Sequence, residues 1–320
     1  MASTTWNNPN YVAQLLKVGR RRTAFLDMIG GLNGGRYKTT RTKRYDMSEI
    51  ETQTAQTQGA LTQDNVAAGV AATNIASAVE VNHIQYEQEQ ISVAYIANSV
   101  TQEVMGSTTT GLGGGQPTNF NVSYKQLERH LRKMALRINA SFLNGTYAES
   151  TASNVAPKTR GIITGCTSNT VAAAAATLTK DMMNELLNEM TASGAAMEMP
   201  VVFVSGNQKV KLSTLYGNAI ESTNIGGFNI QTIITDFGNL GVVLDQDVPT
   251  TTLLIADVAY CQPVFLPVIS TDRNGVQKED LILIEDKSSS GASQKTMIYS
   301  HIGLDYGTEK YHGTITGLKV

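Results

Sequence analysis

The sequence predicts an α+β fold in which one long helix and one compact α/β unit are joined by segments rich in strands. The helix is expected from about residue 123 to residue 145, where apolar residues recur at spacings of three and four and form a single stripe. That stripe consists of Leu127, Leu131, Met134, Ile138 and Phe142. The α/β unit is expected over residues 178–258, where helix and strand patterns alternate. Residues 264–318 show mainly strand patterns.

The first 45 residues are expected to form a basic arm. They contain nine Lys and Arg residues and one acid, giving +8, whereas the rest of the chain has 16 basic and 26 acidic residues, giving −10. The arm positions that we single out are Arg20, Arg21, Arg22, Arg41, Lys43 and Arg44. Such an arm can bind the phosphates of nucleic acid or the acidic bodies of neighbouring copies. A merely solvated terminal segment explains the charge equally well.

Residues 46–95 are expected to form an extended loop. No Lys or Arg occurs from residue 46 to residue 124, and residues 51–77 have no dense apolar face. From Val79 to Tyr95 apolar and polar residues alternate, which is typical of strands. A hairpin with arms of about 15 residues would reach roughly 50 Å, at ~3.3 Å per residue. Because such an arm recovers its ordering entropy only by lying against something, we expect it to contact another copy.

The remaining elements follow in order. A glycine-rich connection at 96–117 precedes the long helix. In the α/β unit, a second helix begins after an N-cap at Thr179, and the apolar run at 201–204 indicates a buried strand. A further helix is expected at 207–216, and further strands at 228–235, 242–244 and 253–256. The tail is expected to hold strands at 281–284, 297–304 and 313–318.

We find no residue combination typical of a catalytic, cofactor-binding or metal-binding site. The four histidines, which lack any metal-binding spacing, are His83, His130, His301 and His312. On the long helix, His130 is expected to be a solvated surface side chain. Asp245 and Asp247 follow a strand and suit either a cation site or a solvated loop, and we favour the loop. We therefore expect no enzymatic activity and no cofactor.

The composition favours a protein that is covered by other proteins. Charged residues make up 16% of the chain, below the usual level of about a quarter, so few charges need desolvation on contact. An ordinary monomer of low charge is the alternative. Cys166 and Cys261 are expected to be buried free thiols. No apolar run approaches the roughly 18–20 residues of a membrane helix, and the N-terminus lacks a signal-peptide pattern, which favours the cytoplasm.

The order of these parts resembles the major capsid, or major head, protein of tailed bacteriophages, which has the Hong Kong 97-type fold. The similar stretches are NHIQ at 82–85, ISV at 91–93, the helix at 127–145, RGI at 160–162, TDFG at 235–238, VP at 248–249, LIAD at 254–257 and GTEKYHGTITGL at 307–318. They extend from about residue 80 to the C-terminus. Tyr311 and residues 171–176 depart from the family pattern, so we carry no family role to them.

The resemblance implies a division into an N-terminal arm at 1–45, an extended β loop at 46–95, a connection at 96–117, a peripheral domain with the long spine helix at 118–177 and 259–320, and an axial α/β domain at 178–258. It implies self-assembly as pentamers and hexamers into an icosahedral head, built in the host bacterial cytoplasm and enclosing double-stranded DNA without sequence specificity. Scaffolding and portal proteins are implied partners, and a decoration protein is left open. The alternatives are another self-assembling structural protein, such as a tail-tube or surface-layer protein, and an enzyme with an unfamiliar site.

Overall fold

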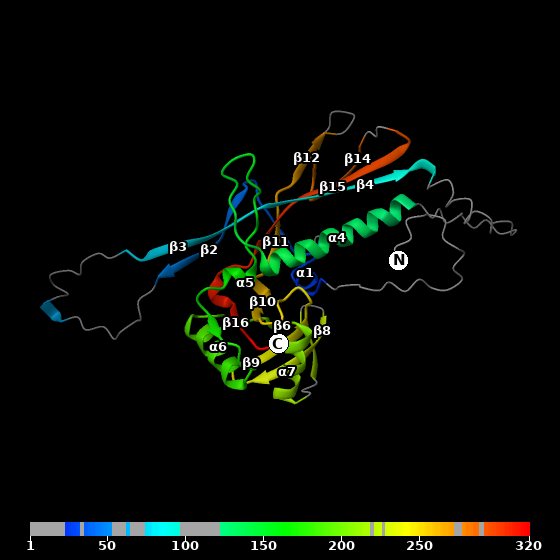
Figure 1. The fold of residues 1–320 in the computed structure, drawn as a ribbon. Coiled ribbons are helices and arrows are strands. Elements are labelled where there is room, and N and C mark those ends of the chain that lie inside the picture. The colour runs from blue at the N-terminus through cyan, green and yellow to red at the C-terminus, as the bar shows by residue number, and fades with distance from the viewer. Residues whose placement is uncertain are drawn as a thin grey trace.

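The computed structural model describes residues 23–32, 35–52, 62–64, 74–96, 122–217, 221–225, 228–271, 277–287 and 291–320. Two sheets organise the chain (Figure 1). The long helix α4 (Val122–Asn144) lies along one of them, and the other carries helices α6 (Lys180–Ala192) and α7 (Gly206–Tyr216). None of the helices in these ranges is both long enough and apolar enough to cross a membrane.

The sheet beside α4 has five strands, arranged around one long central strand, β15 (Ser293–Asp305). On one side of β15 lie β14 (Ile282–Lys287) and β11 (Gln262–Phe265), and β1 (Lys38–Thr39) pairs in parallel with β11. On its other side lies β4 (Gln85–Ala94), antiparallel over ten residue pairs from Ile302↔Gln85 to Ser293↔Ala94.

The second sheet has seven strands in the order β5-β16-β10-β6-β9-β8-β7. Their bounds are Thr170–Ala172, Gly313–Thr316, Leu253–Asp257, Pro200–Val204, Gly238–Leu244, Phe228–Thr235 and Glu221–Ile225. The central strands β6 and β10 are buried on both faces, as a continuous apolar run predicts. On α6, the Thr179 side chain accepts a hydrogen bond from Met182 N at 3.3 Å, which confirms the predicted N-cap.

Two hairpins and several short helical segments lie outside these two sheets in the described residues. The hairpin β2 (Arg44–Thr52)–β3 (Ala76–His83) projects from the body, whereas β12 (Val268–Thr271) and β13 (Gln277–Asp280) form a smaller one (Figure 1). The helical segments are α1 (Ala24–Met28), α5 (Ile162–Gly165), η2 (Val258–Tyr260) and η3 (Glu309–Tyr311). Cys166 and Cys261 are buried free thiols, as predicted.

The apolar stripe of α4 is confirmed, and it is graded along the helix. Met134, Ile138 and Phe142 are at most 1% exposed, whereas Leu127 and Leu131 nearer the N-terminus are only partly buried. The helix therefore inserts its C-terminal half into the core more deeply than its N-terminal half.

Part of the predicted basic arm belongs to the core of its own subunit. In α1, Phe25 and Leu26 are buried, and Ile29 directly after it is buried too. The Phe25 ring meets Phe203 edge to face, with ring centroids 5.2 Å apart. These side chains cluster because they form the apolar face of α1 and of the residue after it. Exposing that face to water would cost free energy.

Strand β4 differs from the extended loop in which the sequence places it. Ile91 and Val93, on alternate positions of this strand, are buried, and the strand pairs with β15 along its whole length. The described part of the projecting hairpin therefore ends at His83, with strands of nine and eight residues rather than about 15. Strands β5 and β16, which the predicted boundaries place in the peripheral domain, complete the seven-stranded sheet.

The burial of Phe25 gives a first prediction. Phe25→Ala should lower the free energy of unfolding by roughly 3–5 kcal/mol, because a fully enclosed ring is lost and a cavity remains. Urea unfolding of unassembled subunits measures this. Phe237→Ala, at a position 37% exposed, is the control and should cost less than about 1 kcal/mol. Equal midpoints for both variants would contradict the assignment of α1 to the core.

Candidate assembly surfaces

Lys38, Arg41 and Arg44 of the arm make ion pairs with the body of their own chain. Lys38 Nζ lies 2.5 Å from Asp305 Oδ2, and Arg41 lies 2.9 Å from Glu279. Arg44 lies 3.8 Å from Glu149, and the Lys43 side chain is exposed. Arg20, Arg21 and Arg22 lie outside the described residues. The structure thus brings Arg41 and Arg44 onto acidic parts of the body, at solvent-exposed positions where such pairs contribute about 0–1 kcal/mol each.

The β2–β3 hairpin is fixed at its base by buried hydrogen bonds. Tyr45 Oη donates to Leu304 O at 2.8 Å, and Asn82 Nδ2 donates to the same carbonyl at 2.8 Å. Asn82 Oδ1 also accepts from Arg160 N at 2.7 Å. One asparagine therefore ties the hairpin to β15 and to the segment after α4, and this explains why the NHIQ stretch is placed where the hairpin meets the body.

Beyond this base, the described outer end of β3 is open to solvent. Ala76, Ser77, Ala78 and Val79 are all exposed, so both faces of β3 are open there. The exposed charged residues on β2 after Arg44 are Asp46, Glu49 and Glu51, all acidic. A second copy that covers this hairpin would have to offer neutral or basic groups.

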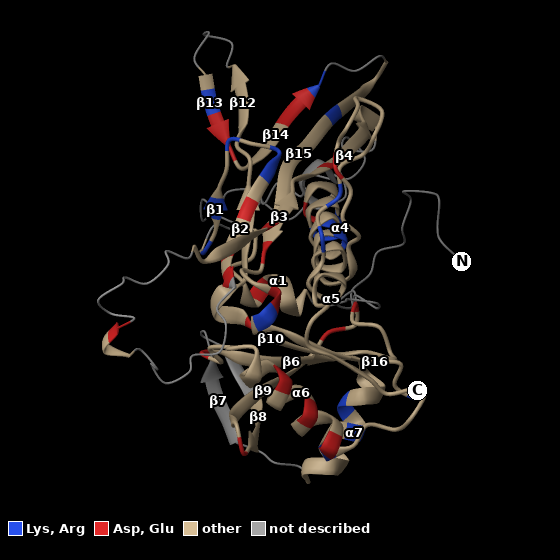
Figure 2. Cartoon of the chain, turned by 90° about the vertical axis from the view of Figure 1, so that its left-hand side faces the viewer, with Lys and Arg blue, Asp and Glu red and all other residues tan. Residues whose placement is uncertain are grey.

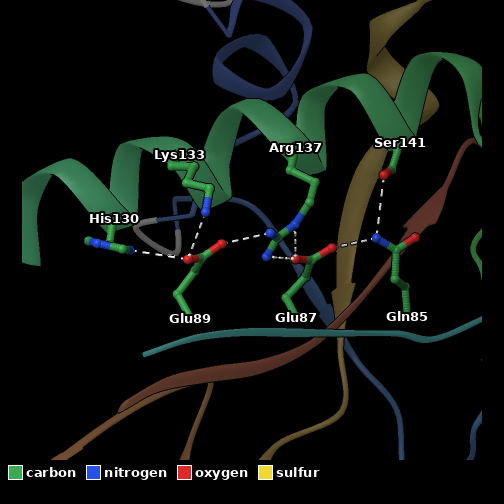
Figure 3. A network of polar contacts seen from close by, with 7 residues as sticks. All are labelled: Gln85, Glu87, Glu89, His130, Lys133, Arg137 and Ser141. Carbon is green, nitrogen blue, oxygen red and sulfur yellow. Dashed lines mark hydrogen bonds and ion pairs between the residues drawn. The ribbon is translucent and has the colours of Figure 1, made fainter. Parts of the chain in front are cut away.

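A network of charged side chains joins α4 to β4 (Figure 3). Arg137 Nε donates to Glu87 Oε2 at 2.5 Å, and Arg137 Nη1 donates to Glu89 Oε1 at 2.7 Å. Lys133 Nζ and His130 Nδ1 each lie 3.1 Å from Glu89 Oε2. The network ends in neutral groups, since Gln85 Nε2 donates to Glu87 Oε1 at 2.5 Å and to Ser141 Oγ at 3.3 Å.

The electrostatics of this network depend on buried carboxylates and exposed cations. Burial alone would raise the pKa of Glu89, but hydrogen bonds from Lys133, Arg137 and His130 outweigh it and lower this pKa to about 2. For Arg137, burial would lower the pKa, and the contacts with Glu87 and Glu89 raise it instead. The Glu89 carboxylate therefore stays ionised wherever the helix is in place.

The expectation that His130 is simply solvated is wrong, because its ring faces Glu89 and is only 27% exposed. The sequence analysis missed Glu87 and Glu89 as well. A signal was present: the two acids are two residues apart on a strand, so they share a face, and His130, Lys133 and Arg137 recur at helical spacing. What the sequence lacked was the pairing of this strand with this helix.

Neither reading of Asp245 from the sequence is right. Asp245 is buried, and its carboxylate accepts hydrogen bonds from Phe25 N at 3.1 Å and from Asn139 Nδ2 at 3.1 Å. Asn139 Nδ2 also donates to Asp247 Oδ2 at 2.8 Å, and Asn139 Oδ1 accepts from Leu26 N at 3.0 Å. Burial raises the pKa of Asp245 despite these bonds. The acids after β9 therefore hold the N-terminus of α1 against α4.

His312 joins the ends of the two sheets. Its Nε2 lies 2.6 Å from Tyr306 O and its Nδ1 lies 3.2 Å from Asp257 N, so the ring donates to the carbonyl and accepts from the amide. The side chain is buried, and burial lowers its pKa below the usual range because a charge there would be desolvated.

Three further features bear on assembly and chemistry. Exposed apolar side chains occur on β8, in the turn that follows it and at the end of β9, at Ile234, Phe237 and Leu244. In Figure 2, basic residues are distributed along α4 and acidic residues along α6. Among the described residues, no group of three or more His, Cys, Asp or Glu side chains is arranged to hold a metal ion.

Comparisons with known proteins agree with this architecture. A family model described as SU10 major capsid protein matches residues 1–319. The capsid of cyanophage A-1(L) is 14% identical, with a TM-score of 0.64, and the match covers 98% of this chain and 97% of that chain. The capsid of a native GTA particle is 12% identical, with a TM-score of 0.60 and coverage of 99% and 97%.

The capsid of Myoviridae phage XM1 is 12% identical, with a TM-score of 0.57 and 97% of each chain covered. The comparison with curated proteins gives no match. At these low identities the structural likeness establishes the fold, which is the Hong Kong 97-type fold of phage capsid proteins.

The buried His312 gives a prediction about acid. An unfolded chain binds a proton at this residue as the pH falls through about 6.5, whereas the folded chain does not, so stability is lost below that pH. From pH 7.5 to 5.5 the free energy of unfolding should therefore fall. His312→Gln should have a lower free energy of unfolding at pH 7.5, and this free energy should fall less steeply as the pH is lowered. His301→Gln, at a half-buried position with a smaller effect of burial on the pKa, should reduce the steepness less. Unfolding titrations at several pH values measure the slopes. An unchanged slope in His312→Gln would refute this assignment.

Proposed function

The chain belongs to the SU10 major capsid protein family, and from this premise we propose that it assembles as pentamers and hexamers into an icosahedral bacteriophage head that encloses double-stranded DNA. It is a structural capsid protein of the virion, and self-association into a shell is its role. The observation that carries the finer proposal is the β2–β3 hairpin: its base is bonded into the body, and the described outer end of β3 is exposed on both faces.

Each predicted segment receives a role in this proposal. The axial domain, 178–258 with β5 and β16 added from the structure, would surround the symmetry axes, where exposed Ile234, Phe237 and Leu244 offer apolar surface. The peripheral domain, with α4 and β15, would form the outer part of each capsomer. The extended loop would lie across a neighbouring subunit, and the glycine-rich connection at 96–117 would link it to α4.

The proposed partners follow from the same reading. Scaffolding and portal proteins would guide assembly in the host bacterial cytoplasm, and packaged DNA would be held without sequence specificity. A decoration protein on the outside is compatible with this arrangement. We propose that the chain itself catalyses no reaction and needs no cofactor. A tail-tube or surface-layer role is not favoured, since the matching family is one of capsid proteins.

The proposal is tested by expressing the chain alone and with the scaffolding protein encoded by its phage. Closed particles with five- and six-fold clusters, visible by electron microscopy, are the expected result. A matched variant replaces residues 53–75 with Asn-Gly, which joins Thr52 to Ala76, the last residue pair of the hairpin. This variant should unfold cooperatively like the wild type but form no particles. A wild-type chain that stays monomeric with its partners, or a variant that still builds shells, would count against the proposal.

The arm residues give a separate prediction. We propose that Arg20, Arg21 and Arg22 dock on neighbouring subunits rather than on DNA, because packaged DNA has to slide along the inner wall. Replacing all three with Gln should reduce the yield of DNA-free shells several-fold, as measured by sedimentation. The control is Arg41→Gln with Arg44→Gln, whose cations pair with Glu279 and Glu149 of their own chain and should matter less. Normal empty shells combined with steeply salt-dependent DNA loss would instead assign the arm to DNA.

A further inference from the structure

The attachment of α4 to the rest of the subunit changes character along its length. Its C-terminal half is held by Met134, Ile138, Phe142 and Leu143, which are at most 1% exposed. Its N-terminal half has only partly buried Leu127 and Leu131, together with polar contacts of His130 and Lys133 to Glu89. The C-terminal half also carries Arg137, which pairs with Glu87 and Glu89. The C-terminal half is therefore attached by apolar burial and charge, whereas the N-terminal half depends largely on its polar contacts with Glu89.

The charged contacts are asymmetric with respect to solvent. Glu87 and Glu89 on β4 are 2% and 8% exposed, whereas Lys133 and Arg137 on α4 are 64% and 40% exposed at their side chains. The residues opposite the two acids on β15 are Ser300 and Ile298, which carry no charge. In the described residues, α4 thus supplies the cations that compensate both carboxylates.

This asymmetry makes the attachment reversible. Closing the helix over β4 removes two carboxylates from water, which costs desolvation free energy. The ion pairs offset this cost with only a small net stabilisation. Opening the N-terminal half restores water to Glu89, which keeps Arg137 of the anchored half as a partner, so no uncompensated buried charge is left behind. Because the cations face solvent, added salt weakens the closed state. The apolar half of α4 has no such dependence on salt.

We propose that the N-terminal half of α4, with Glu89 of β4, forms an ionic latch that opens locally while the C-terminal half of the helix, with Arg137, stays anchored. The latch lets the angle between α4 and the sheet of β4 and β15 change without unfolding either element. Its use in a shell, where subunits at different positions meet at different curvature, rests on the proposed function. The latch itself is a property of one subunit.

Amide hydrogen exchange of the full-length, unassembled subunit tests the latch, so the outcome does not depend on shell formation. Glu89→Gln should speed exchange at residues 126–133 by about tenfold or more and leave residues 138–144 unchanged, because Arg137 keeps Glu87 as its partner. Raising salt from 0.1 M to 1 M should speed the same segment in the wild type. The matched control is Glu128→Gln, because Glu128 forms an exposed pair with Arg132 on the same helix and should change exchange little.

A second variant removes the risk that the change at Glu89 prevents folding. Lys133→Gln alters a side chain that is mostly in solvent, and it should speed exchange at residues 126–133 roughly threefold. Exchange that rises equally over the whole helix would assign the network to global stability and overturn the latch. Exchange at residues 126–133 that is unchanged in Lys133→Gln or by salt would overturn it as well.

Discussion

The two central strands β6 and β10 have to serve two hydrophobic cores at once, and the rest of the subunit is arranged around this constraint. Val201, Phe203, Leu254 and Ala256 face the core that contains α1 and α4. The alternating residues Val202, Val204, Leu253 and Ile255 face the core under α6. Because successive side chains of a strand point to opposite faces, the two strands join the cores without any linker. The two parts of the subunit are therefore held together by a shared sheet.

Buried polar groups then fix the relative positions of segments that apolar packing alone does not determine. Asp245 and Asn139 accept the backbone amides of α1, Asn82 ties the projecting hairpin to β15, and His312 joins Tyr306 to Asp257. Each of these side chains is buried and hydrogen-bonded, so each selects one arrangement of its neighbours. They lie where segments distant in sequence meet, which is where apolar packing alone would allow several registers.

Outside these joints, the subunit presents surfaces that suit contact with copies of itself. The described end of the hairpin is exposed and its exposed charged side chains are acidic, and β8, β9 and the turn between them expose apolar side chains. The arm keeps part of its basic charge on its own body through Lys38, Arg41 and Arg44. A capsid subunit needs a rigid body with attached parts that can adjust, and the graded attachment of α4 meets both needs.

The sequence by itself determined the long helix, the N-cap of α6, the buried strand at 201–204 and the class of protein, because these depend on local periodicity, caps and motif order. Tertiary structure decided the rest. The apolar face of α1 gave no sign of where it would pack, so its burial against Phe203 could not be foreseen. Strand β4 reads the same from its own residues in an exposed loop or in a sheet, and only pairing with β15 distinguishes them. The same holds for Asp245 and His130, whose roles depend on partners more than 40 residues away in the sequence. The free energy of a buried polar or charged group is set by the groups that surround it, and only folding of the chain brings those groups together.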